Sequence, residues 1–260
     1  RGVGAEVYYS PGWHHAIKPI FDFNALSLVF KLRKHKIIKC ILHHSSRTWA
    51  YGHLLFFGIP QIHIFHRERY KRYHYFRRFI ALSPAYMQWL QKNYPLFGFR
   101  KVTWAPNGIW KLNIKKEWKP PKTPFKIGFI GRGGAGKGVD TLFEAAKQLA
   151  DQEAYFELHF AGDCEEFIFQ EAERYSLRSY THHNGWLDDP TEFIDRIDLL
   201  VLPSIKEAFG LVLIEAMARN KPVLATKCNG PASFIKDGKT GYLTEIGNST
   251  ALANSIYNAL

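Results

Sequence analysis

The sequence predicts an α/β fold with two doubly wound parallel-sheet domains, on three observations. Short apolar runs alternate with segments of helical periodicity along both halves of the chain. A Lys- and Pro-rich stretch with little apolar periodicity, KLNIKKEWKPPKTP (111–124), separates the halves. The net charge also changes there, from +18 over residues 1–124 to −6 over residues 125–260. We therefore place an N-terminal domain at residues 1–118 and a C-terminal domain at residues 119–260.

The N-terminal half alternates apolar runs with helical patterns. Asn24 suits a helix N-cap, and Pro84 suits the first turn of a helix. Strands are expected at 4–10, 37–44, 60–66 and 77–83, with a last strand and turn at 101–108, and helices at 24–33, 47–57 and 84–92.

The C-terminal half shows a cleaner alternation, which is typical of a parallel sheet with crossover helices. Strands are expected at 125–131, 155–161, 179–183, 198–203, 222–226 and 241–244. Helices are expected at 138–150, 164–176, 190–196, 210–219 and 248–260.

Composition restricts the class of protein and its compartment. The 260 residues are 46% hydrophobic and 22% charged, which favours a globular protein over a disordered one. The sequence has no apolar run of about 18–20 residues and no recognisable leader, so we expect neither a membrane span nor a signal peptide. Cys40, Cys164 and Cys228 are far apart and form no C-x-x-C motif, which argues against a disulfide framework or a zinc site and for a cytoplasmic location.

The stretch IGFIGRGGAGKGVD (127–140) fits three phosphate-binding patterns at once. A P-loop requires Ser or Thr after Lys137, to hold magnesium, and Gly138 stands there instead. A dinucleotide fingerprint requires an acidic residue at the end of the next strand, but Glu157 lies inside that strand. A third kind of site would hold a diphosphate through the cations Arg132 and Lys137. A glycine-rich turn without any ligand is the fourth interpretation.

A second glycine-containing turn favours the third interpretation. In PSIKEAFGLVLIEAMARNKPVLAT (203–226), Gly210 is expected to open a helix, so the amides of Gly210 and Leu211 would lie at a helix N-terminus. Free N–H groups and the helix dipole stabilise an anionic diphosphate at such a position. Two strand-helix turns, one of which carries Arg132 and Lys137, would then meet at one crevice.

Six segments of the second domain resemble, in order, the donor-binding domain of family 4 glycosyltransferases, the retaining enzymes of the GT-B fold. They are FIGRGGAGKGVDTLFEA, HFAGD, HHNGWL, IDLLVLPS, EAFGLVLIEAMARNKPVLAT and NGPASFIKDGKTGYL, within residues 127–245. In the first domain, IALSPAYMQWL and KVTWAPNGI resemble the last strands of the acceptor domain. The resemblance implies two Rossmann-like domains. The sequence lacks the acceptor domain's opening strand and Gly-rich turn, so we expect a shortened N-terminal domain.

The resemblance also implies roles for particular residues. A glycosyl donor leaves a nucleoside diphosphate, and cations and N–H groups stabilise the charge that grows on it. Glu207 would contact the donor sugar or the reacting region, and Glu215 the ribose hydroxyls; the plain alternative for Glu215 is a salt bridge on a helix face. Leu187 would lie in the segment that meets the base. The remaining donor-binding residues are expected to be Arg132, Gly133, Lys137, Phe209, Gly210 and Leu211. No Asp-X-Asp motif occurs, so we expect no required metal or other cofactor.

The basic N-terminal half predicts an anionic partner. By the same resemblance, His66 in IFHRER would lie near the donor sugar, although this half holds nine of the twelve histidines. FHRERYKRYHYFRRF (65–79) places six Lys or Arg among six aromatic residues. This pattern fits a solvated basic face, an anionic membrane surface or single-stranded nucleic acid. We expect peripheral binding to a membrane surface, because no nucleic-acid signature accompanies the stretch.

The resulting hypothesis is a retaining glycosyltransferase that moves a sugar from a nucleoside-diphosphate sugar to a lipid-linked or polysaccharide acceptor hydroxyl. One alternative is a catalytically inactive partner subunit that binds a nucleotide sugar. Another is a non-transferase enzyme on the same fold, such as an epimerase or a phosphorylase. A phosphorylase would need a pyridoxal phosphate lysine, for which the sequence has no motif.

Overall fold

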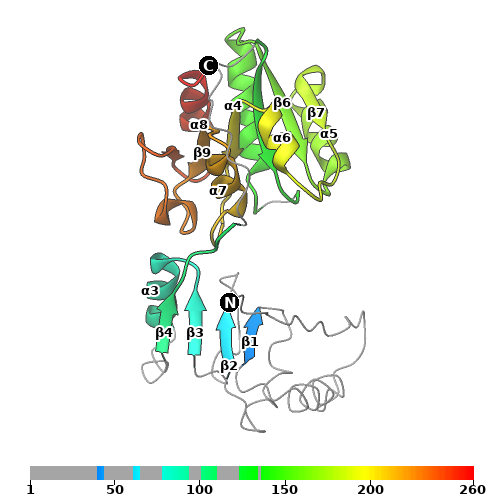
Figure 1. Ribbon diagram of the computed structural model, residues 1–260. Helices are drawn as coiled ribbons and strands as arrows, with labels where there is room; N and C mark the ends of the chain where they lie inside the picture. The colour runs from blue at the N-terminus through cyan, green and yellow to red at the C-terminus, as the bar shows by residue number, and fades with distance from the viewer. Residues whose placement is uncertain (1–39, 44–60, 65–77, 94–100, 110–122, 134–135) are drawn as a thin grey trace. The chain divides into compact units, whose positions relative to one another are not determined.

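The computed structural model describes residues 40–43, 61–64, 78–93, 101–109, 123–133 and 136–260 (Figure 1). The chain divides into two compact units, one made of residues 1–81 and 87–105 and the other of residues 82–86 and 106–260. The boundary expected at residue 118 lies outside the described residues, as do the elements expected at 4–10, 24–33 and 47–57.

The first unit contains a four-stranded parallel sheet of order β1-β2-β3-β4. Helix α3 follows β3 and begins as the sequence predicts; its residues up to Tyr86 belong to the second unit and the rest to the first. Pro84 is the first helical residue, and the Ser83 hydroxyl before it accepts the N–H of Tyr86 at 3.1 Å. The elements are β1 (Cys40–His43), β2 (Gln61–Ile64), β3 (Arg78–Ala81), α3 (Pro84–Asn93) and β4 (Lys101–Trp104).

The second unit confirms the predicted alternation element by element. Its strands are β5 (Phe125–Ile130), β6 (Phe156–Ala161), β7 (Thr181–His183), β8 (Leu199–Leu202), β9 (Val223–Thr226) and β10 (Tyr242–Thr244). Its α-helices are α4 (Val139–Asp151), α5 (Glu165–Arg174), α6 (Thr191–Arg196), α7 (Leu211–Ala218) and α8 (Ser249–Tyr257), and two short 3-10 helices are η4 (Arg178–Tyr180) and η5 (Pro231–Ser233).

The sheet of the second unit is wholly parallel, with the strand order β10-β9-β8-β5-β6-β7. The chain begins in the middle at β5, moves outward through β6 and β7, and returns to the other side of β5 with β8. The carboxyl ends of β5 and β8 therefore flank the point where the winding reverses, and ligands of doubly wound sheets bind at that point.

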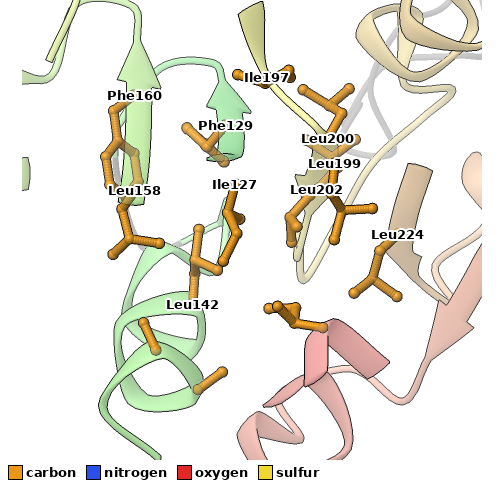
Figure 2. Packing of buried hydrophobic residues seen from close by; sticks show 14 of the residues in the cluster. Ile127, Phe129, Leu142, Leu158, Phe160, Ile197, Leu199, Leu200, Leu202 and Leu224 are labelled. Carbon is orange, nitrogen blue, oxygen red and sulfur yellow. The ribbon is translucent and has the colours of Figure 1, made fainter. Parts of the chain in front are cut away.

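The core of this unit lies between the sheet and its helices. Phe156, Leu158 and Phe160 alternate along β6 and are at most 2% exposed. The ring of Phe160 stacks on Phe143 of α4 with centroids 5.3 Å apart, so this face of β6 packs against α4. Figure 2 shows Leu142 of α4 near side chains of the central strands. Burying each such side chain stabilises the fold by about 1.5–3 kcal/mol.

No helix in the described part of the chain is long and apolar enough to cross a membrane. Two of the three cysteines, Cys164 and Cys228, are free thiols in buried positions.

A buried ion pair joins α6 to the end of α7. Arg219, 6% exposed, donates from Nε to Asp195 Oδ1 at 2.8 Å and from Nη2 to Oδ2 at 2.5 Å. We expect Asp195→Ala to lower the free energy of unfolding by about 3 kcal/mol, because it leaves a buried guanidinium without this carboxylate. Glu192→Ala removes an exposed partner of Arg196 on the same helix and should cost under about 0.5 kcal/mol. Urea titration of both variants would compare them, and equal losses would contradict the expectation.

Candidate functional site

The candidate site begins at two loops that leave neighbouring strands. β5 and β8 pair directly, with Ile127 opposite Leu199 and Gly128 opposite Leu200. The loops that begin at Gly131 and at Pro203 therefore leave the sheet side by side, on either side of the reversal of winding.

Glycines allow these two loops to touch. The carbonyl of Gly136 accepts the N–H of Ile205 at 3.1 Å and that of Lys206 at 3.4 Å. Gly138 has a left-handed backbone with φ of 63°, and a Cβ there would lie 2.0 Å from the carbonyl oxygen of Pro203. The chain can make this contact because Gly138 has no side chain. The glycine-rich turn thus holds the second loop in place.

Lys137 and Glu207 meet where the loops touch. The Lys137 ammonium donates to Glu207 Oε2 at 2.6 Å, and the side chains are 29% and 16% exposed. Both residues are predicted from the sequence, but their contact is not. The pair places a cation and a carboxylate at the edge of the sheet, so an anionic ligand that binds Lys137 must compete with Glu207.

Arg132 and Lys137 also line one cavity of about 620 Å³. The backbone of Gly133 comes close to α5 here, since a Cβ on Gly133 would lie 2.3 Å from the Cβ of Cys164. The side of this cavity formed by residues 163–167 is not predicted from the sequence. The motif Ala161-Gly162-Asp163 at the end of β6 leads directly to it. The lining residues are Arg132, Gly133, Gly136, Lys137, Asp163, Cys164, Glu166 and Phe167.

The N-terminus of α7 lies at the end of the second loop. Gly210 is the N-cap, with a left-handed φ of 92°, and its cap geometry includes no side-chain hydrogen bond. Leu211 is the first helical residue, and 43% of its surface is exposed. The first N–H groups of a helix lack acceptors within the helix and carry partial positive charge. The helix start that the sequence predicts can therefore bind an anion.

A further loop supports the turn before α7. Phe209 is 5% exposed, and its ring lies 5.0 Å from that of Phe234. The N–H of Gly230 donates to the Glu207 carbonyl at 2.9 Å, and a Cβ on Gly230 would lie 2.4 Å from the Phe209 nitrogen. The buried ring of Phe209 thus anchors the backbone around Glu207, and the place of Phe209 among the donor-binding residues stays a prediction.

Glu215 lies further along α7 and is half-buried. Burial, followed by the nearby negative charge of Asp189, raises the pKa of the Glu215 carboxyl. Asp189 belongs to the segment between β7 and α6, so this segment approaches α7. The same segment carries Leu187, which packs partly against the hydrophobic core, and Trp186, which is 67% exposed. A second cavity, of about 550 Å³, is lined by Trp186 and by Gly162, Asp163, Glu165, Glu166, Phe169, His183 and Gly185.

The raised pKa of Glu215 predicts a pH-dependent cost to stability. A carboxyl whose folded pKa lies above its unfolded value stabilises the fold at low pH, and that contribution is lost as pH rises through the folded pKa. At neutral pH the ionised, half-buried carboxylate is therefore destabilising. We expect Glu215→Gln to raise the melting temperature slightly at pH 7 and to reduce the fall in stability between pH 4 and pH 7.

If Glu215 also binds a nucleotide, the same variant loses a charge-assisted hydrogen bond, which weakens binding about tenfold or more. Thermal melts across pH and calorimetry with nucleoside diphosphates would measure both effects. Lower stability at pH 7 in Glu215→Gln would contradict the prediction. Asp189→Asn tests the contribution of the Asp189 charge to the raised pKa of Glu215. The variant removes that negative charge and keeps a side-chain oxygen that can accept the N–H of Thr191.

The structure gathers some of the predicted residues and separates others. Lys137 joins both features, because it contacts Glu207 and lines the first cavity with Arg132 and Gly133. The other predicted residues of the second unit lie outside that cavity's lining, on or near α7 or in the segment after β7: Leu187, Glu207, Phe209, Gly210, Leu211 and Glu215. His66 lies outside the described residues.

Residues 111–260 match a family model described as glycosyl transferases group 1. The chain is 35% identical over 150 residues to the N-acetyl-alpha-D-glucosaminyl L-malate synthase of Bacillus anthracis, which covers 56% of this chain and 39% of that protein. It is 31% identical over 127 residues to the lipopolysaccharide core biosynthesis glycosyltransferase LpsE of Rhizobium meliloti, which covers 49% and 37%. The aligned segments thus span about two fifths of the relatives' own length.

Solved structures share the fold at low sequence identity. A glycosyltransferase of Rickettsia africae superposes with a TM-score of 0.77 at 18% identity, over 95% of this chain and 74% of that one. HepE of Anabaena, solved in complex with UDP and glucose, superposes with a TM-score of 0.70 at 20% identity, over 90% and 71%. These likenesses support the predicted fold class of two Rossmann-like parallel-sheet domains.

Proposed function

Because the chain belongs to the group 1 glycosyl transferases, we propose that it transfers a sugar from a nucleoside-diphosphate sugar to an acceptor hydroxyl with retention of configuration. The observation that carries the proposal is the placement of Lys137 and Glu207 in contact at the reversal of winding, beside the N-terminus of α7. A solved relative in complex with UDP and glucose supports a UDP-sugar donor.

The leaving diphosphate would be stabilised by positive groups from both loops. Arg132 supplies a planar guanidinium, Lys137 a mobile ammonium, and Gly210 and Leu211 backbone N–H groups at the start of α7. Groups that are already in place cost no reorganisation when negative charge grows on the leaving oxygen. Gly133 lets the first loop approach the ligand, and Phe209 holds the second loop.

Two carboxylates would orient the rest of the donor. Glu207, released from Lys137 when the diphosphate binds, would accept hydrogen bonds from the sugar hydroxyls near the reacting carbon. Glu215 would accept from the ribose hydroxyls, and the backbone around Leu187 would meet the base. We propose that the acceptor proton passes to the departing phosphate on the same face, without a covalent glycosyl-enzyme intermediate. His66 would contact the donor sugar from the first domain.

Divalent metal is not required for the chemistry in this proposal, because Arg132, Lys137 and the start of α7 already supply positive charge. The sequence also contains no Asp-X-Asp motif. Donor turnover should therefore be equal with and without added Mg²⁺ or Mn²⁺. A rate that appears only with one of these ions would contradict this part of the proposal.

The acceptor would be a lipid-linked or polysaccharide hydroxyl. Matched relatives act in lipopolysaccharide core and capsular polysaccharide biosynthesis, by their names. The +18 charge of residues 1–124 supports docking of that half on an anionic membrane surface, from the cytoplasmic side. Flotation with anionic and neutral liposomes would test this, and equal, negligible binding to both would contradict it.

A screen of UDP, GDP and ADP by calorimetry, followed by assays with the matching sugar nucleotides, would test the function as a whole. Transferase activity predicts binding of one diphosphate and release of that diphosphate from its sugar donor. The alternative is an inactive partner subunit that binds a nucleotide sugar. Tight binding of a diphosphate with no turnover of any donor would favour it.

A further inference from the structure

Three potential metal ligands gather on one face of the second unit's sheet. Glu157 and His159 are two residues apart on β6, so both side chains leave the same face. His182 of β7 is the direct register partner of His159. The potential ligand atoms of the three residues lie within 4.8 Å of one another.

The individual distances are close to those of a coordination sphere. Glu157 Oε2 lies 2.8 Å from His159 Nε2, and Glu157 Oε1 lies 4.0 Å from His182 Nε2. Bonds of about 2.0–2.2 Å to a tetrahedral Zn²⁺ place its ligand atoms roughly 3.4 Å apart. The three residues therefore need shifts of about 1 Å, chiefly at His182, whose side chain is 48% exposed and free to rotate from its stack on His159.

This cluster is separate from the donor site. The side chains of Phe156, Leu158 and Phe160 face α4, so Glu157 and His159 face the opposite side of the sheet. The residues of the donor site follow the carboxyl ends of the strands, whereas Glu157 lies four residues before the end of β6. At about 3.3 Å per residue, His159 is roughly 7 Å and Glu157 roughly 13 Å from that edge along the strand.

We propose that Glu157, His159 and His182 form a binding site for one divalent cation of the zinc class. Two imidazole nitrogens and a carboxylate oxygen suit Zn²⁺, whereas Mg²⁺ and Ca²⁺ prefer all-oxygen ligands. The solvent-exposed side of His182 leaves a fourth position for water. The proposal does not depend on the proposed function.

The bound ion would fix the edge of the sheet. β7 is three residues long and ends the strand order, so one neighbour alone, β6, holds it in the sheet. An ion shared by His182 and the two β6 residues would cross-link these strands. The segment that carries Gly185, Trp186 and Leu187 continues directly from β7, and its starting point would be fixed by the same link.

The positive charge of Lys126 is expected to weaken the binding of a cation at this site. Lys126 is the register partner of Glu157 on β5, and its positive charge acts on both Glu157 and His159. A cation in the cluster is repelled by this ammonium, which weakens its binding. Lys126→Gln should bind Zn²⁺ more tightly than the wild type.

Equilibrium dialysis of the full chain against buffered Zn²⁺, with bound metal counted by mass spectrometry, would test the site. Nine of the twelve histidines lie in residues 1–124 and can also bind zinc, so the measured quantity is a difference between variants. His182→Ala and Glu157→Gln should each bind one ion fewer than the wild type at a concentration that fills the site. His183→Gln is the matched control, because it changes the next residue of β7, which points to the other face.

Two further measurements make the outcome decisive. Zn²⁺ should raise the melting temperature of the wild type and of His183→Gln more than that of His182→Ala, and Mg²⁺ should not reproduce the shift. Circular dichroism would confirm that the variants fold, and the exposed position of His182 makes its replacement structurally mild. Equal zinc counts in the wild type, His182→Ala and Glu157→Gln would overturn the proposal. So would a stability gain that persists unchanged in His182→Ala.

Discussion

Glu207→Gln is expected to lower donor turnover by about a hundredfold to a thousandfold while it tightens the binding of the nucleoside diphosphate. Turnover should fall while diphosphate affinity rises, because Glu207 acts differently in the free protein and during the reaction. In the free protein its carboxylate holds Lys137 at 2.6 Å and so competes with the diphosphate for that cation. During the reaction it would orient the donor sugar. An amide keeps most of the shape but removes the negative charge.

The expected gain in affinity follows from the ion pair. Lys137 and Glu207 are partly buried, at 29% and 16% exposure, and such a pair contributes about 1 kcal/mol once solvent screening is included. Removal of this competition should tighten diphosphate binding about fivefold. Calorimetry with the diphosphate and a coupled assay with the sugar donor would measure the two effects on the same sample.

Lys137→Ala provides the opposite case. It removes the cation itself, so both diphosphate affinity and turnover should fall, each by about tenfold or more. Lys147→Ala is the control, because it removes an exposed lysine from α4, the helix that follows the loop of Lys137, where it pairs with Asp151. Its affinity and turnover should match those of the wild type. Unchanged turnover in both Glu207→Gln and Lys137→Ala would remove the basis of the proposed function.

The sequence predicts the second unit almost completely because its signals are local. Apolar runs mark the buried strands, and Gly210 marks the start of α7, so the expected and observed bounds differ by only a few residues. The contact between Lys137 and Glu207 is not local. It depends on β5 and β8 being neighbours in the sheet, and periodicity along the chain does not show which strands are neighbours.

The cluster of Glu157, His159 and His182 on the sheet face could not be predicted for the same reason. The sequence argues against a zinc site only through its three cysteines, which are far apart and form no C-x-x-C motif. Glu157 and His159 come from one strand and His182 from the next, and register alone brings the histidines together. The part of the first cavity lined by Asp163 and Glu166 was not predicted either, because the sequence there indicates only that a strand ends. His66 stays a prediction, since it lies outside the described residues.

Gly138→Ala should destabilise the protein strongly. Gly138 is the N-cap of α4 and has a left-handed backbone with φ of 63°, which L residues with a side chain seldom adopt. The added Cβ would lie 2.0 Å from the carbonyl oxygen of Pro203, a backbone atom with no side-chain freedom to move away. Backbone strain and overpacking together should cost about 4 kcal/mol.

Gly136→Ala is the control for Gly138→Ala. It removes a glycine from the same turn without a clash with the carbonyl of Pro203. A Cβ on Gly136 would meet no atom within 4 Å, so its stability should stay within about 0.5 kcal/mol of the wild type. Urea titrations of the two variants would give the comparison. If Gly138→Ala does not yield soluble protein, Gly162→Ala offers a second test, because its Cβ would lie 2.0 Å from the Gly131 carbonyl at a φ of 137°.

The two variants should also differ in ligand binding. The contact between Gly138 and Pro203 holds the loop of Lys137 against the loop of Glu207, so a forced separation moves the two charges apart. Gly138→Ala should therefore weaken diphosphate binding even at temperatures where it stays folded, and by more than Gly136→Ala does. If Gly138→Ala were as stable as Gly136→Ala, the two loops could not be packed as the structure places them. The contact between the loops of Lys137 and Glu207, on which the proposed donor site depends, would then be contradicted.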